Sequence, residues 1–255
     1  MKMTYEFLQD AIRNCFLKAQ KINWQCDHHD ARQLAKDGIV TIPGFVSSET
    51  ANEYRGLIHQ LIGRMQGDAE GREYIDGAMC IDRGKRFKSD FNMIDIFDIE
   101  KALPELSYLK QSAHMLNVVR EVSGQELKVE NLNVYVNRGI KPRVLHIDSF
   151  TSTQYKAFIY LTDVDTLADG PYMYVKGSHL CSDKKILSYI ENYENDNYAT
   201  DMRAFSYDDA TPCFGKKGTL IISDQSGVHG AHPQPESAER VLLMFNLSSS
   251  KIIPK

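Results

Sequence analysis

The sequence has few cysteines and no long hydrophobic run. Its five cysteines are scattered over 255 residues without a Cys-x-x-Cys pair, at Cys15, Cys26, Cys80, Cys181 and Cys213. An odd, scattered set argues against a disulfide framework, so we expect reduced thiols and a cytoplasmic protein. Because no apolar run reaches the roughly 18 residues that a membrane helix needs, we expect neither a membrane span nor a signal peptide.

Charge of one sign is not in excess either. The chain has 30 lysines and arginines against 34 aspartates and glutamates, a formal net charge of −4. We therefore expect a small-molecule partner, and no binding to nucleic acid or to an anionic membrane. With 42% hydrophobic residues and no internal repeat, the chain can bury one substantial core, which predicts a single domain over residues 1–255.

The hydrophobic pattern of the first half is mainly helical. Apolar side chains recur at helical spacing in three stretches, Thr4 to Trp24, Ala51 to Ile62 and Leu103 to Val122. Ser47 or Ser48 is a candidate N-cap for the second of these helices. All three helices are expected to support the core.

From Leu127 onward the pattern becomes strand-like. Short apolar runs alternate with glycine, proline, asparagine and aspartate, as is typical of a double-stranded β-helix. We therefore expect a mainly β fold with flanking helices. A jelly roll of the cupin type is predicted for residues 126–250, with a largely helical support that includes a lid in residues 1–125.

The run Val144 to Asp148 carries the first candidate site. Its histidine and carboxylate, His146 and Asp148, are two residues apart, so on a strand both side chains point to one face and can bind one ion. A third ligand is available at His229, which follows the apolar run Gly218 to Ile222 and a turn. Two histidines and one carboxylate leave coordination positions open, which suits catalytic Fe(II) better than structural zinc.

Arg240 adds a candidate anchor for an acidic cosubstrate. It opens the apolar run Val241 to Phe245, which we expect to form the next strand and to return the guanidinium beside the metal. A planar, permanently charged guanidinium binds a carboxylate through two parallel hydrogen bonds. Holding the far end of 2-oxoglutarate requires this kind of contact.

A His-x-Asp pair taken alone has ordinary explanations. Most such pairs lie on the surface or contain a buried, hydrogen-bonded histidine. The metal-site interpretation depends on the order of features: His-x-Asp, then a strand, a turn and a histidine, then an arginine that opens another strand. His232, three residues after His229, is a rival third ligand, and His179 is expected to be structural.

Together with their surroundings, these residues resemble the phytanoyl-CoA dioxygenase family of Fe(II)- and 2-oxoglutarate-dependent oxygenases over most of the chain. Beside the metal motif, the similar stretches are Lys36 to Phe45, Tyr160 to Val164, Asp169 to Pro171, Gly177 to His179 and Gly218 to Asp224. Two positions depart from the family's usual pattern. Lys176 stands where a proline often precedes Gly-Ser-His, and Ala231 stands where some members have a small hydroxyl residue.

The resemblance implies an activity and a set of roles. His146, Asp148 and His229 would bind Fe(II), and Arg240 would pair with the distal carboxylate of 2-oxoglutarate. With O2 as the second cosubstrate, the expected reaction is hydroxylation of a C–H bond of a small molecule, with release of succinate and CO2.

Two further polar residues are candidates for the cosubstrate. Related enzymes use a polar residue upstream of His-x-Asp to hydrogen-bond 2-oxoglutarate, and Asn133 is predicted to do so from the polar face that it shares with Tyr135 and Asn137. A solvent-facing polar stripe is the ordinary alternative. Lys156 is a competing carboxylate partner, ranked below Arg240 because a lysine near a strand start commonly extends to solvent.

Two segments are candidates for choosing the substrate. Gly71 to Asn92 is expected to be a mobile, basic lid that recognises an anionic substrate, or else a solvated loop; its cations are Arg72, Arg83, Lys85, Arg86 and Lys88. Ser182 to Cys213 contains a predicted helix, Lys184 to Tyr193, and is expected to cover the active site.

Other function classes remain open at this stage. A cupin-like metalloenzyme that does not use 2-oxoglutarate would tolerate Arg240→Ala, and a non-catalytic binding protein would not consume 2-oxoglutarate. A zinc hydrolase would stay active without O2. The sequence does not identify the substrate, because related cores process many classes of molecule.

Overall fold

The structure is a computed structural model that describes residues 5–249, except 68, 69, 88–91, 140, 142, 143, 151–153 and 196–199. The α-helices among these residues are α1 (Tyr5–Ala19), α2 (His29–Asp37), α3 (Ser48–Ile62), α4 (Arg83–Phe87), α5 (Ala113–Ser123) and α6 (Asp183–Glu194). The short 3-10 helices are η1 (Ile99–Lys101), η2 (Pro104–Gln111), η3 (Leu167–Asp169) and η4 (Tyr207–Asp209).

Local capping decides where the predicted helices begin. The Ser47 hydroxyl accepts a hydrogen bond from the Thr50 amide at 3.1 Å, which confirms a serine N-cap for α3. The single helix predicted for Leu103 to Val122 is divided into η2 and α5. Pro104 begins the first, and the Ser112 side chain caps the second, because a serine hydroxyl competes with the helical backbone for its amides.

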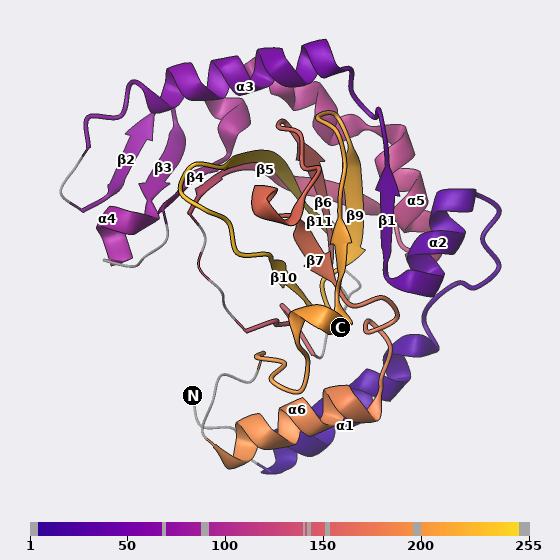
Figure 1. Ribbon diagram of the computed structural model, residues 1–255. Coiled ribbons are helices and arrows are strands. Elements are labelled where there is room, and N and C mark those ends of the chain that lie inside the picture. The colour runs from indigo at the N-terminus through magenta and orange to yellow at the C-terminus, as the bar shows by residue number, and fades with distance from the viewer. Residues whose placement is uncertain are drawn as a thin grey trace.

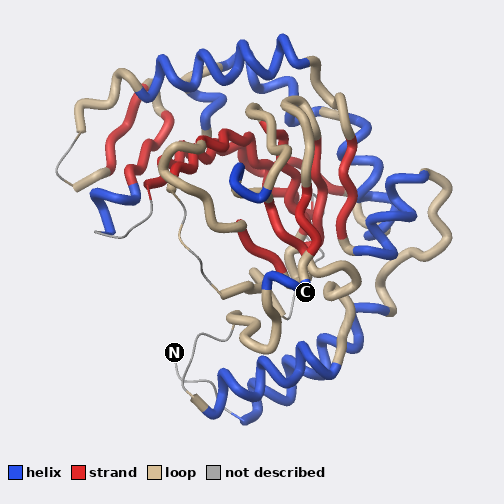
Figure 2. The backbone as a smooth tube through the Cα atoms, viewed as in Figure 1, coloured by secondary structure: helices blue, strands red, loops and turns tan. Residues whose placement is uncertain are grey.

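The strands form a large and a small antiparallel sheet (Figures 1 and 2). The large sheet has the order β1-β9-β6-β11-β5-β4-β3-β2, and the small sheet has the order β10-β7-β8. The strands are β1 (Ile39–Ile42), β2 (Arg72–Ile75), β3 (Ala78–Asp82), β4 (Asn92–Phe97), β5 (Leu127–Arg138), β6 (Tyr155–Tyr160), β7 (Tyr172–Tyr174), β8 (Thr211–Cys213), β9 (Leu220–Asp224), β10 (His229–Ala231) and β11 (Glu239–Ser249).

Alternating side chains give the large sheet two different faces. On its outer face, residues such as Val134 and Leu243 pack against Ile58 of α3 and Val119 of α5 in one buried cluster, and Figure 1 shows these helices along that side of the curved sheet. On its inner face, Tyr160 and the neighbouring inward residues pack against the small sheet. Two facing antiparallel sheets with helices outside form a double-stranded β-helix, as predicted.

The predicted lid has a different structure. Most of Gly71 to Asn92 is the hairpin β2–β3 followed by α4, and β4 joins this hairpin to β5 in the large sheet. Lys88 lies outside the described residues. Ala78 and Cys80 are fully buried, so the described part of this region belongs to the sheet and its core, and the expectation of a loop is wrong there. Its role as a lid stays a prediction.

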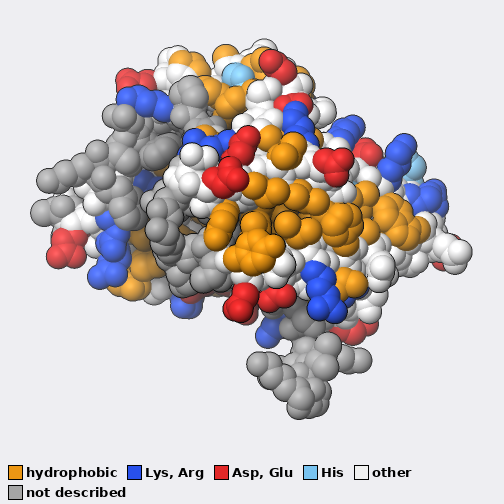
Figure 3. Space-filling model, turned by 90° about the horizontal axis from the view of Figure 1, so that it is seen from below, with side chains coloured by type: hydrophobic (Ala, Val, Ile, Leu, Met, Phe, Trp, Pro, Cys, Tyr) orange, Lys and Arg blue, Asp and Glu red, His pale blue; other side chains and the backbone are white. Residues whose placement is uncertain are grey.

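Helices α1 and α6 lie side by side beneath the barrel (Figure 1). The helix predicted at Lys184 to Tyr193 is confirmed as α6. The two helices bury Leu8, Ala11 and Tyr189 in a common cluster. Seen from below, hydrophobic side chains also gather on the outer surface of this pair (Figure 3), where α1 exposes Phe16 and α6 exposes Leu187. Among the described residues, no helix is long and apolar enough to cross a membrane.

Candidate metal centre

His146, Asp148 and His229 converge at the end of the barrel beneath the large sheet. The Asp148 Oδ1 atom lies 3.8 Å from His146 Nε2 and 3.6 Å from His229 Nε2. The two imidazole rings have their centroids 4.5 Å apart. Each residue can offer one atom to a common ion, so the structure brings together the three ligands that the sequence predicts.

Long-range backbone pairing places His146 and Asp148. The His146 amide donates to the His229 carbonyl at 2.9 Å, and the His229 amide donates back to His146 at 2.8 Å. The Asp148 amide donates to the Gln225 carbonyl at 2.9 Å. The expected regular strand is therefore replaced by an extended segment in which His146 forms isolated bridges with Asp201 and His229. The alternation holds nevertheless, because Leu145 and Ile147 are buried on the opposite side, in the cluster with α1 and α6.

The turn before β10 orients the His229 ring. The Asp224 carboxylate accepts from the Ser226 amide at 2.9 Å and so closes the turn. His229 Nδ1 lies 2.8 Å from the Gly227 carbonyl, an acceptor, so Nδ1 carries the proton and donates. Nε2 is then left with the lone pair that a metal requires.

Lys156 holds the other oxygen of Asp148. Its ammonium donates to Asp148 Oδ2, whereas Oδ1 faces the two histidines. Burial opposes ionisation of Asp148, but its contacts with His229 and with the ammonium of Lys156 outweigh burial, so the pKa of Asp148 lies well below its usual value. The carboxylate is therefore ionised, and Lys156 contacts a ligand rather than solvent.

Arg240 lies in the same cavity as the three ligands. This cavity has a volume of about 350 Å³ and is lined by residues of β5, β6 and β11 as well as by the ligands. Arg240 is 4% exposed and donates to the Gly170 carbonyl. Its Nε has no hydrogen-bond partner among the described residues, and no carboxylate there pairs with it. A buried guanidinium without a counter-ion is costly, so the site has the charge and donors to bind an anion.

The remaining predicted residues occupy different positions. Asn133 is not among the cavity-lining residues, and its side-chain oxygen accepts from the Asp98 amide at 3.1 Å. Tyr135 and Asn137, on the same face of β5, do line the cavity. The polar face of this strand therefore points inward, but the Asn133 oxygen is already used by the backbone.

His232, the rival third ligand, and His179 both lie apart from the cluster. His232 Nδ1 contacts the Pro233 carbonyl at 2.8 Å, and its ring packs edge-on against Tyr207. His179 is buried beneath β7 with Nε2 3.0 Å from the Ala35 carbonyl. Burial lowers the pKa of His179. Neither ring belongs to the group formed by His146, Asp148 and His229.

Sequence reasoning missed several polar residues of the cavity wall. Gln225 donates from Nε2 to Ser223 Oγ at 2.7 Å and to the Tyr172 hydroxyl at 3.2 Å. The Tyr172 ring lies 5.6 Å from the His229 ring. Arg83, in contrast, is one of the cations of the predicted lid; it reaches the cavity from α4 and is paired with the buried carboxylate of Asp95. Periodicity alone does not show which strand ends meet here.

A second group of metal-ligand type lies outside the barrel. His28, Asp30 and His114 bring their side chains together where α2 and α5 begin. Asp30 Oδ2 lies 3.7 Å from His28 Nδ1 and 3.2 Å from His114 Nε2. This group lies at the surface. None of its three residues lines the metal cavity or the neighbouring cavity beside α1.

Comparison with solved structures relates the fold to several proteins that were crystallised with 2-oxoglutarate or are named as dependent on it. HygX from Streptomyces hygroscopicus with nickel and 2-oxoglutarate bound superposes with a TM-score of 0.62 at 19% identity, covering 88% of this chain and 87% of that one. The non-heme alpha ketoglutarate dependent carbocyclase SnoK from nogalamycin biosynthesis gives 0.62 at 18%, with 91% and 86% covered. EctD from S. alaskensis with 2-oxoglutarate and 5-hydroxyectoine gives 0.57 at 16%, with 86% and 74% covered.

These likenesses establish the fold. The chain has the jelly-roll fold of these solved structures. No protein-family model and no curated protein sequence matches it. Membership of the phytanoyl-CoA dioxygenase family therefore stays a prediction.

Proposed function

We propose that the protein is an Fe(II)- and 2-oxoglutarate-dependent oxygenase that hydroxylates a C–H bond of a small molecule. One observation carries the proposal: a two-histidine, one-carboxylate cluster shares a cavity with a buried arginine that has no anionic partner among the described residues. The cluster provides three ligands and leaves positions open. The arginine provides a site for the distal carboxylate of the cosubstrate.

The donor set fits the absent iron and oxo acid. His146, Asp148 and His229 would hold the metal through Nε2, Oδ1 and Nε2, the atoms that face one another. When bound, iron and 2-oxoglutarate together supply oxidation by O2, with succinate and CO2 as by-products. Solved structures with this fold contain iron or nickel and 2-oxoglutarate, which supports the same assignment here.

The residues of this chain would orient the cosubstrate and the metal ligands and exclude water from the site. Arg240 orients the cosubstrate from the deep end of the cavity, and Lys156 keeps Asp148 Oδ1 turned towards the histidines. Phe158, Leu242 and Met93 contribute apolar surface to the wall. A pre-organised site that excludes water favours oxidation of the bound substrate over side reactions with water.

A cupin-like metalloenzyme that does not use an oxo acid is the second candidate. It would use the same three ligands, and no residue of the cluster excludes it. The cupin-like candidate does not explain why Arg240 is buried in the metal cavity without an anionic partner among the described residues. The oxygenase proposal explains it, because the distal carboxylate of 2-oxoglutarate would be that partner. We therefore favour the oxygenase.

The test is an anaerobic titration of Fe(II)-loaded protein with 2-oxoglutarate. We expect a visible metal-to-ligand charge-transfer band that disappears in His146→Ala and needs far more 2-oxoglutarate in Arg240→Ala. Arg64→Ala, on an arginine at the surface, is the matched control and should behave as wild type. Folded, iron-bound wild-type protein that develops no band would contradict the proposal and favour the cupin-like alternative.

A further inference from the structure

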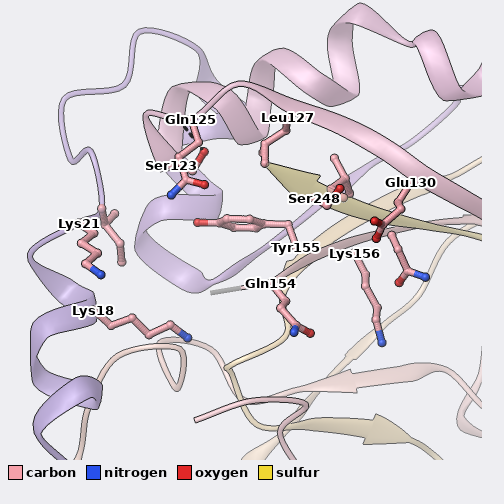
Figure 4. Close-up of a pocket in the computed structure, with 13 residues that line it drawn as sticks. Lys18, Lys21, Ser123, Gln125, Leu127, Glu130, Gln154, Tyr155, Lys156 and Ser248 are labelled. Atoms are coloured by element: carbon pink, nitrogen blue, oxygen red, sulfur yellow. Dashed lines mark hydrogen bonds between the residues drawn. The ribbon is translucent and has the colours of Figure 1, made fainter. Parts of the chain in front are cut away.

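A second cavity lies between α1 and the ends of three strands of the large sheet. Its volume is about 410 Å³, and Figure 4 shows the residues that line it. The wall is formed by α1 on one side and by the beginnings of β5 and β6 and the end of β11 on the other. The function proposed above assigns no role to this space.

The register of the sheet places this cavity beyond the metal on the same inner face. Along β11, Arg240 and Leu242 line the metal cavity, whereas Asn246 and Ser248 line the second one. These residues differ by even numbers, so they share one face of the strand. Asn246 is directly opposite Lys156 on β6.

Lys156 belongs to the walls of both cavities. Its ammonium contacts the metal ligand Asp148, so the second cavity opens beside the metal centre. Arg240 and Asn246 are six residues apart on one strand, which corresponds to about 20 Å. The order along the inner face is therefore the cosubstrate anchor, the metal ligands, and then the second cavity.

Hydrogen-bond donors and positive charges dominate the second cavity. Three lysines line it, Lys18, Lys21 and Lys156, against the single carboxylate of Glu130. The side-chain amides of Gln125, Gln154 and Asn246 also line it. Figure 4 shows the ammonium ends of Lys18 and Lys156 on opposite sides of Gln154.

Lys18 is the most informative of these residues. Its side chain is 7% exposed, and its ammonium has no hydrogen-bond partner among the described residues. The nearest carboxylate oxygen that pairs with it, Asp224 Oδ1, is 3.9 Å away and already accepts from the Ser226 amide. A buried ammonium without hydrogen bonds is costly, so its presence in a cavity wall indicates a ligand that supplies an acceptor.

We propose that this cavity binds the acidic group of the organic substrate, a carboxylate or a phosphate, and that Lys18 and Lys21 are its charged contacts. The inference rests on the oxygenase function proposed above. A substrate held there by its acidic end would extend past Lys156, so that its oxidised carbon faces the metal. The substrate class is thus a small organic acid or phosphate ester long enough to span the two cavities.

The first test measures anion binding directly. Equilibrium dialysis of Ni(II)- and 2-oxoglutarate-loaded protein against inorganic phosphate or acetate keeps the metal and Arg240 occupied. We expect one anion site, weakened about tenfold or more in Lys18→Met and in Lys21→Met, since each removes a charged hydrogen bond, and preserved in Lys18→Arg. Lys36→Met, at an exposed lysine that lines neither cavity, is the matched control.

The two probes also distinguish the two kinds of acidic group. Tighter binding of phosphate assigns a phosphate ester, and tighter binding of acetate assigns a carboxylic acid. Equal affinity of Lys18→Met, Lys21→Met and Lys36→Met for both probes would overturn the proposal. Lys21 is exposed, so Lys21→Met gives a result even where replacement of the buried Lys18 disturbs folding.

The second test uses turnover. Acids and phosphate esters of increasing chain length are compared with their neutral methyl esters or alcohols for stimulation of succinate formation. We expect stimulation by the anionic members only, with a KM raised about tenfold or more in Lys21→Met and a nearly unchanged kcat, because the contact is remote from the reacting carbon. Stimulation that is equal for charged and neutral partners, or absent from both, overturns the assignment to the substrate.

The charge-transfer band separates this proposal from the function on which it rests. Lys18 does not line the metal cavity, so Lys18→Met should keep the band. A wild-type band without a lysine-dependent anion site refutes the substrate assignment and leaves the oxygenase standing. A lysine-dependent anion site without the band refutes the oxygenase.

Discussion

The chain carries the sequence His-x-Asp twice, and each copy lies beside a second histidine from a distant part of the chain. His28 and Asp30 lie beside His114, as His146 and Asp148 lie beside His229. The spacings are similar: carboxylate-to-imidazole distances are 3.7 and 3.2 Å in the first group and 3.8 and 3.6 Å in the second. Ligand type and distance therefore do not distinguish them.

Their surroundings do distinguish them. The side chains of His28 and His114 are 49% and 40% exposed, against 5% for His229. His28 Nδ1 accepts from the Asp30 amide at 3.2 Å as the N-cap of α2, so hydrogen bonding already explains this ring. Around His229, the hydrogen bond at Nδ1 instead turns Nε2 towards the carboxylate. Among the described residues, the second group shares a cavity with a buried arginine, Arg240. A His-x-Asp motif thus becomes informative through what surrounds it.

Removing one histidine from each group tests this difference with the largest expected effect. His146→Ala should lower Fe(II)-dependent succinate formation by at least about three orders of magnitude, because the metal supplies several kcal/mol of catalysis. His114→Ala should leave it within a factor of two. Both variants are assayed for bound iron and for succinate at saturating 2-oxoglutarate. Equal losses in the two variants would show that the surface group also serves the reaction.

Removing the arginine tests the second distinguishing feature. Arg240→Ala should raise the 2-oxoglutarate concentration that gives half of the charge-transfer band by about 100-fold, as expected when one partner of a buried charge pair is truncated. Arg240→Lys keeps the charge but not the planar fork, and should fall between Ala and wild type. Iron content is measured in parallel and should not change. An unchanged requirement for 2-oxoglutarate in Arg240→Ala would contradict the assignment.

The contact between Lys156 and Asp148 is a smaller difference between the groups. Lys156→Met should weaken Fe(II) binding about tenfold, since residues that orient a metal ligand commonly contribute a factor of 10–100. Lys156→Arg retains a donor to Asp148 Oδ2 and should recover much of the affinity. The readout is a competition titration with a chelator, together with the unfolding midpoint of the metal-free protein, which separates ligand orientation from a general loss of stability. Wild-type iron affinity in Lys156→Met would show that Lys156 does not position Asp148.

Local sequence patterns predicted those features that depend on neighbours along the chain. The cap of α3 follows from turn chemistry, and the strand that carries Arg240 follows from its run of apolar residues. Alternation also predicted that His146 and Asp148 share a face, although their backbone pairs with residues far along the chain instead of forming a regular strand.

Features set by tertiary contacts were not predictable in this way. The strands β2 and β3 are short and carry charged residues, so their sequence pattern resembles that of a loop. They form a hairpin because β3 pairs with β4. Asn133 was placed on the correct face, but the approach of Asp98 from η1 could not be read from alternation. Lys18 falls on an amphipathic helix as an ordinary polar position, and only the packing of α1 beside the sheet buries it.

The smallest expected effect concerns the surface group itself. In His114→Ala, α5 loses the contact of its ring with Asp30 of α2, and we expect the free energy of unfolding to fall by about 0.5–1 kcal/mol, as for other partly exposed pairs. His28→Asn removes an imidazole but keeps a side-chain acceptor for the cap, so it should cost less than His28→Ala. Urea unfolding with Zn(II) and with a chelator provides the measurement. If Zn(II) raised the unfolding midpoint of wild type and not of His114→Ala, the surface group would be a second metal site, and exposure would no longer separate the two copies of the motif.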